Sequence, residues 1–279
     1  MTKILRTLAD LRVWRADRRG VGLVPTMGAL HAGHRSLIER ATNGNGEIVV
    51  SIFVNPAQFT NADDLARYPR DLDADAEIVA EAGGTAIYAP DASEMYPAGF
   101  ATCVSVTGVT EDYEGEARPG HFDGVATVVT ILLNQVRPDR SYFGEKDFQQ
   151  LAMIRRMHRD LSLPGEIIEC PTVRDHDGLA LSSRNSRLSE SGRQAALVLS
   201  STLFAMRDHA LDNLESPRRL TVMGAVLISA NPAVALDYLE IVDPATLDPV
   251  DALAQGSRAL VAATVDGVRV IDTIELIPR

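Results

Sequence analysis

The chain has 279 residues, of which 46% are hydrophobic and 23% are charged, as is usual for a globular protein with a sizeable core. Its formal net charge of −11 argues against nucleic acid as the main partner, because a phosphate backbone requires a basic surface. No apolar run reaches the ~18 residues of a membrane span and the N-terminal stretch is not a secretory signal, so we expect a cytoplasmic protein that binds neither nucleic acid nor membrane.

The first two thirds of the chain alternate strand-like and helix-like segments. Apolar runs predict strands at 21–25, 47–54, 85–89, 140–143 and 166–170. Helical patterns cover 34–42, 63–82 with a break at Pro69, 123–136 and 147–161. Such alternation predicts an α/β domain with a parallel sheet, which binds its ligands beyond the carboxyl ends of the strands.

The pattern changes near residue 185. Two helices, at 189–211 and 217–229, precede strands at 236–242, 258–265 and 268–276, and Asp266-Gly267 is a typical hairpin turn. We therefore expect an α/β protein with a Rossmann-like parallel sheet in residues 1–178 and a smaller α+β domain in residues 179–279.

The stretch VPTMGALHAGHRSL, residues 24–37, places His31 and His34 where a helix follows a strand and a glycine turn. Free backbone N–H groups and the helix dipole favour an anion there, and the imidazoles add donors. Taken alone, two such histidines are more often structural, one capping a turn and one half-buried. A zinc site is less favoured still, because no nearby Cys or His completes a ligand set.

Two further segments carry cations. Ser182, Ser183 and Arg184 combine two hydroxyls with a guanidinium, a combination suited to polyphosphate, although a helix cap with a surface arginine is the plainer alternative. In FGEKDFQQL, residues 143–151, Lys146 follows a strand and can neutralise charge developing on a phosphate.

Two more segments carry neutral amides and carboxylates. Asn55 and Gln58 follow a strand and suit a small polar acid, although Asn-Pro is also a common turn starter. Asp71, Asp73 and Asp75 form an acidic segment in which one carboxylate suits Mg²⁺, the alternative being a solvated helix face.

These pieces, in this order, resemble the pantothenate synthetase (pantoate–β-alanine ligase) family. The motifs that carry the resemblance are PTMGALHAGH, FVNPAQF, YPRDL, RPGHFDGVATVV, FGEKDFQQL and DGLALSSRN, which span most of residues 24–185. The His-x-Gly-His pattern alone indicates only the wider cytidylyltransferase-like nucleotide-binding superfamily. The resemblance implies that ATP and pantoate form pantoyl adenylate and pyrophosphate, and that β-alanine then displaces AMP.

The resemblance also implies roles for individual residues. Catalysis falls to His31, His34 and Lys146. ATP would contact these three together with Met27, Gly144, Asp147, Val173, Ser182, Ser183 and Arg184. Pantoate would contact Gln58, Gln150, Met27 and Asn55. Asp75 would hold the Mg²⁺ that accompanies ATP. Some members of the family have a further acidic residue just before this aspartate, where this chain has Ala74, so whether Asp75 alone holds the metal stays open. The family further implies a homodimer and a C-terminal domain that closes as a lid.

Two alternatives remain at the level of sequence. Another nucleotidylyltransferase of the same superfamily would share the histidines but keep the nucleotide on its product. A catalytically silent nucleotide-binding module would bind ATP without turnover.

Overall fold

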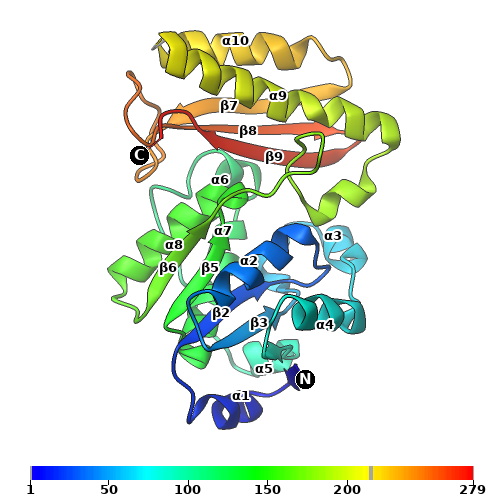
Figure 1. Cartoon of the computed structure of the whole chain (residues 1–279), viewed down its shortest axis with the longest axis vertical. Helices are drawn as coiled ribbons and strands as arrows, with labels where there is room; N and C mark the ends of the chain where they lie inside the picture. Colours follow the sequence, from blue (N-terminus) through cyan, green and yellow to red (C-terminus); the bar gives the residue numbers. More distant parts are fainter. Residues whose placement is uncertain (1, 214–215, 279) are drawn as a thin grey trace. The chain divides into compact units, whose positions relative to one another are not determined.

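A computed structural model describes residues 2–213 and 216–278 and divides into two compact units (Figure 1). The first unit comprises the chain up to Gly144 together with Met153–Pro171. The second comprises Glu145–Ala152 together with the chain from Thr172 onward. The sequence predicts a domain boundary after residue 178. In the structure the first unit ends at Pro171, and the short segment Glu145–Ala152 belongs to the second unit.

The first unit contains a six-stranded sheet in which every neighbouring pair is parallel. Its strands lie in the order β1-β4-β3-β2-β5-β6. Their bounds are β1 Lys3–Leu5, β2 Val21–Thr26, β3 Glu47–Ile52, β4 Ala86–Tyr88, β5 Arg140–Gly144 and β6 Glu166–Cys170. The predicted parallel α/β sheet is thereby confirmed. The strand order reverses at β2, between β3 and β5, and ligands of such sheets bind beyond the carboxyl ends at that reversal.

Helices join these strands. They are α1 Leu8–Arg15, α2 Ala32–Thr42, α3 Ala62–Arg67, α4 Leu72–Glu81, α5 Ala92–Met95, α6 Glu114–Ala117 and α7 His121–Val136, and α8 Phe148–Asp160 continues from the second unit into the first. Helices α2 and α4 share a core with β2 and β3 that includes Ile38, Val50 and Val79. Helix α7 packs on β2, α1 and the 3₁₀ turn η1 (Pro56–Gln58), so the sequence after β3 is held against α7.

The second unit is the smaller α+β domain that the sequence predicts. Strands β7 Val234–Val242, β8 Arg258–Val265 and β9 Val268–Glu275 form an antiparallel sheet in the order β7-β8-β9. Helices α9 Glu190–Asn213 and α10 Pro217–Ser229 cover one face of it (Figure 1). Asp266 and Gly267 both have positive φ, as a two-residue hairpin turn requires. The unit also contains the 3₁₀ turns η2 Glu145–Asp147 and η3 Ser183–Arg187.

Among the residues that the structure describes, none of the helices is both long and apolar enough to cross a lipid bilayer.

Candidate active site

The two histidines of the opening motif cap helix α2. His31 is the N-cap residue, and its Nδ1 accepts a hydrogen bond from the backbone N–H of Gly33 at 3.1 Å. His34 Nδ1 accepts from the backbone N–H of His31 at 3.3 Å, and the two rings lie 4.2 Å apart. Both histidines therefore have a structural role, because they cap the N-terminus of α2. Histidine is an unusual N-cap residue, since serine, threonine, aspartate and asparagine are the preferred ones.

Capping also decides where each neutral imidazole carries its proton. An Nδ1 atom that accepts from a backbone N–H must be unprotonated, so the proton of each ring lies on Nε2. Both histidines are thereby fixed as Nε2–H donors at a helix N-terminus. That arrangement favours an anionic ligand.

Asp75 holds the loop that leads to these histidines. Its Oδ1 accepts from the backbone N–H of Leu30 at 2.7 Å, and its Oδ2 accepts from that of Ala29 at 3.1 Å. Ala29 has a positive φ of 51°, a conformation that costs free energy unless the surroundings hold it. Gly28 also has positive φ, and a Cβ there would lie 2.8 Å from Asp75 Oδ2. The carboxylate and the glycine together define the loop.

The surroundings of Asp75 do not favour direct metal binding. The side chain is 3% exposed, and each of its oxygens already accepts from the main chain. Burial raises the pKa of Asp75, although the hydrogen bonds from Leu30 and Ala29 act in the opposite direction. A magnesium ion prefers a nearly octahedral set of accessible oxygens, most of them water or phosphate. Magnesium binding at Asp75 stays a prediction.

Replacing Asp75 with Asn should destabilise the loop. An asparagine retains one acceptor oxygen but turns an NH₂ group toward the second backbone N–H, which leaves a buried donor unsatisfied. We expect the free energy of unfolding to fall by about 1–3 kcal/mol, measured by urea denaturation. Asp73→Asn is the control, because Asp73 is exposed on the same helix and should change stability by less than about 0.5 kcal/mol. Equal stability of the two variants would contradict the anchoring role.

A buried cluster of amides follows β3. Asn55 caps η1 and is 1% exposed, and Gln58 ends the turn and is 9% exposed. Asn55 Nδ2 donates to Gln58 Oε1 at 2.9 Å and to the carbonyl of Gly124 at 3.1 Å. Its Oδ1 accepts from the backbone N–H of Ala57 at 3.2 Å. Both amide groups are therefore held in one orientation, and Gln58 Nε2 points to Met27 Sδ at 3.2 Å.

Three residues outside the predicted set support this cluster. The Tyr96 hydroxyl donates to Asn55 Oδ1 at 2.7 Å, and burial raises the pKa of Tyr96 to about 12, so the donor proton stays in place at neutral pH. His121 Nδ1 lies 2.8 Å from the carbonyl oxygen of Gln58, and Arg118 Nη1 lies 3.1 Å from His121 Nε2. Because a guanidinium only donates, His121 Nε2 accepts and Nδ1 carries the proton.

These residues gave only a weak sequence signal. His121 and Arg118 lie in RPGHFDGVATVV, which carries the family resemblance, but nothing local indicates that they contact residue 58. Tyr96 reaches Asn55 across 41 positions of sequence.

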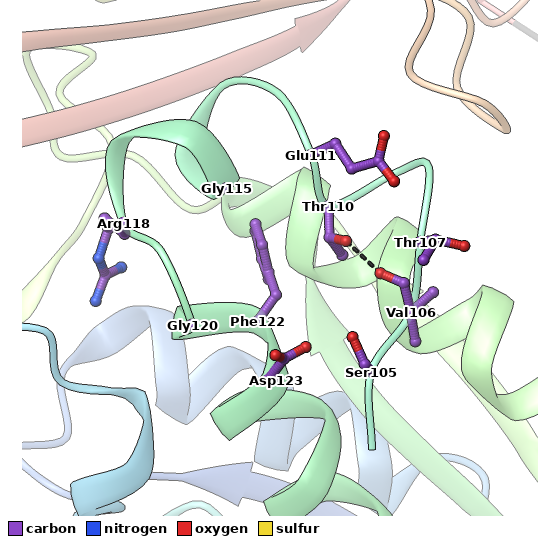
Figure 2. A pocket seen from close by; sticks show the side chains of 10 residues that line it. All are labelled: Ser105, Val106, Thr107, Thr110, Glu111, Gly115, Arg118, Gly120, Phe122 and Asp123. Carbon is purple, nitrogen blue, oxygen red and sulfur yellow. Dashed lines mark hydrogen bonds between the residues drawn. The ribbon is translucent and has the colours of Figure 1, made fainter. Parts of the chain in front are cut away.

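The first unit has a further hollow that includes none of the predicted site residues. Figure 2 shows it around the start of α7, with Phe122, Asp123, Thr110 and Ser105 among the side chains that line it. Its volume is about 200 Å³. Within Figure 2 the guanidinium of Arg118 turns away from Glu111 on the far side of the hollow.

In the second unit, Lys146 and Ser182 line the same small hollow of about 20 Å³, together with Asn185 and Asp272. Lys146 is 18% exposed, and its Nζ lies 3.5 Å from Asp147 Oδ1. Ser182 caps η3 by accepting from the backbone N–H of Arg184 at 3.3 Å. The structure thus gathers one cation and one hydroxyl of the predicted phosphate set.

The remaining predicted residues lie as follows. Gly144 ends β5 and is half-buried, as are Gln150 near the start of α8, Val173 in the loop after β6, and Ser183 and Arg184 in η3. Asp147 is exposed in η2. Their binding roles stay predictions.

Comparison with known proteins places the whole chain in one family. The model of the Pantoate-beta-alanine ligase family matches residues 3–275. A pantothenate synthetase of Chelativorans sp. is 49% identical over 97% of this chain and 96% of the relative, and one of Thermus thermophilus is 49% identical over 99% and 100%.

Solved structures of pantothenate synthetases lead to the same family. The crystal structure of a Thermus thermophilus pantothenate synthetase superposes with a TM-score of 0.96 at 48% identity and covers 99% of this chain and 100% of its own. A Francisella tularensis pantoate–β-alanine ligase, complexed with beta-gamma ATP and β-alanine, has a TM-score of 0.81 at 32% identity and covers 99% and 98%. With nearly every residue matched and about half of them identical in the nearer relatives, this chain belongs to the pantoate–β-alanine ligase family.

Proposed function

We propose that the residues described above carry out the family's reaction, the ATP-dependent condensation of pantoate with β-alanine through pantoyl adenylate. A pantoate carboxylate oxygen attacks the α-phosphorus of ATP, and pyrophosphate leaves. The neutral amine of β-alanine then attacks the acyl carbon and loses a proton, and AMP leaves with the carboxylate oxygen. The first step brings two anions together, so donors and cations must be in place beforehand.

The observation that carries this proposal is the pair of capping histidines. Both rings are held as Nε2–H donors at the N-terminus of α2, beside the point where the sheet order reverses. His31 and His34 bind phosphate oxygens of ATP and stabilise the charge that builds up during adenylation. Because their protons are already on Nε2, no rearrangement is needed when ATP arrives.

Gln58 binds pantoate with the donor end of its amide. Its Oε1 is occupied by Asn55, so Nε2 is the group offered beside Met27, and an oxygen of the acid accepts from it. Asn55 supports this contact by fixing Gln58, since the hydrogen bonds of its own amide go to the protein. Gln150 adds a second amide for pantoate.

The second unit supplies the other phosphate-binding groups. Lys146 neutralises charge on the reacting phosphate, and Ser182, Ser183 and Arg184 hold the outer phosphates. Gly144, Asp147 and Val173 contact the nucleoside. Magnesium enters with ATP as part of the substrate, and no step is assigned through Asp75. The proposal includes a homodimer, a cytoplasmic location and a lid role for the C-terminal domain, all supported by the family resemblance.

Isotope transfer tests the proposal. Pantoate carrying ¹⁸O in both carboxylate oxygens is incubated with ATP, magnesium and β-alanine, and the products are analysed by mass spectrometry. We expect one ¹⁸O in the phosphate of AMP for each pantothenate formed, because only an acyl adenylate transfers that oxygen. A nucleotide conjugate in place of AMP would indicate another nucleotidylyltransferase, and unlabelled AMP would exclude the adenylate.

A further inference from the structure

We propose that Arg258 is a positioning residue for Lys146, an inference that rests on the function proposed above. Arg258 is the first residue of β8, the central strand of the antiparallel sheet, and is 3% exposed. It contacts the segment 145–148, called here the lysine segment, on both sides of Lys146.

The first contact is an ion pair. Arg258 Nη2 donates to Glu145 Oε2 at 2.9 Å, and the Glu145 side chain is 22% exposed. A charge-assisted hydrogen bond to so buried a guanidinium is strong, because little water competes for it. It fixes the residue that precedes Lys146.

The second contact fixes the residues that follow. The guanidinium carbon of Arg258 lies 4.1 Å from the centre of the Phe148 ring, and Phe148 is 2% exposed. A flat guanidinium can lie on an aromatic face and hold a carboxylate at once, with a planar set of donors that the compact ammonium of a lysine lacks. One arginine therefore holds both Glu145 and Phe148.

The strand to which Arg258 belongs keeps this arrangement rigid. Arg258 pairs with Val242 on β7 and with Glu275 on β9, so its backbone is held on both sides. The lysine segment itself is mostly a 3₁₀ turn, whose hydrogen bonds have poorer geometry than those of an α-helix. The placement of Lys146 thus depends on a side chain that lies far away in the sequence, in another element of the same unit.

The first test is amide hydrogen exchange of Arg258→Gln and wild type, followed by mass spectrometry of the peptide covering 144–151. We expect at least about tenfold faster exchange in the variant. Arg193→Gln is the control, because Arg193 also forms ion pairs within the second unit, with Asp175 at 2.5 Å and with Asp177, and none of these three residues lines the hollow of Lys146. Unchanged exchange in Arg258→Gln, or the same increase in Arg193→Gln, would overturn the proposal.

The second test separates positioning from general stability. Arg258→Gln should slow pantoate-dependent pyrophosphate exchange about tenfold in the wild-type background, and less than about twofold in a Lys146→Ala background. Glu145→Gln should slow exchange in the same way, strongly in the wild-type background and weakly in the Lys146→Ala background. This variant replaces Arg258→Gln in the test if Arg258→Gln does not fold. Equal slowing in both backgrounds would refute the proposal. A wild-type protein without pantoate-dependent turnover would instead refute the proposed function, and hydrogen exchange would still decide the role of Arg258.

Discussion

Lys146→Ala should lower the rate of adenylate formation by about 10²–10³-fold, the usual effect of removing one group that stabilises charge in a transition state. The fold should be preserved. The Lys146 ammonium lies 3.5 Å from Asp147, whose side chain is 50% exposed, and such pairs add little stability. The measurement is pyrophosphate release in a single turnover with ATP, magnesium and pantoate.

The chain offers a direct control for that experiment. Lysine occurs only at positions 3 and 146, so Lys3→Ala removes the other lysine ammonium of the protein. It should leave the single-turnover rate within about twofold of wild type, since surface substitutions away from a site have small effects. A normal rate in Lys146→Ala, or an equal loss in Lys3→Ala, would remove Lys146 from the mechanism.

Gly124→Ala should weaken pantoate binding through the backbone. A Cβ at Gly124 would lie 2.3 Å from the carbonyl oxygen of Ala57 and 2.7 Å from the backbone nitrogen of Gln58. Neither atom belongs to a flexible side chain, so η1 must move away from α7. A displacement on the order of 1 Å can cost up to about 10²-fold in activity, so we expect the KM for pantoate to rise at least about tenfold, whereas the KM for ATP stays within about threefold.

Overpacking should also lower the free energy of unfolding of Gly124→Ala by about 1–3 kcal/mol. Gly46→Ala is the control, since a Cβ there would meet only the carbonyl oxygen of Arg19, at 4.0 Å. That control should keep wild-type kinetics and stability. An unchanged KM for pantoate in Gly124→Ala would show that Gln58 does not bind pantoate.

Strands β2 to β6 of the first unit could be predicted because each is an apolar run that is visible in the sequence alone. The apolar run at 47–54 became β3, and the predicted break at Pro69 separates α3 from α4, which Asp71 caps. By contrast, β1 and α1 were not predicted. Strand β1 has three residues and pairs with β4 in the register Lys3↔Ala86, so its stability depends on a partner far along the chain.

The candidate site was predictable to a similar extent. Histidines and amides after strands indicated where a ligand site is expected, because parallel strands end at one edge of their sheet. The function of Asp75 as an anchor could not be foreseen, since its partners are backbone amides at positions 29 and 30. The same holds for Tyr96 and His121, whose contacts with Asn55 and Gln58 come only from folding.

Reversible activation of pantoate by adenylation should appear as exchange of labelled pyrophosphate into ATP. The wild-type protein is incubated with ATP, magnesium, pantoate and labelled pyrophosphate in the absence of β-alanine. We expect labelled ATP only when pantoate is present, and we expect AMP and pantothenate once β-alanine is added. A folded protein that binds ATP but shows no pantoate-dependent exchange would rule out activation by adenylation.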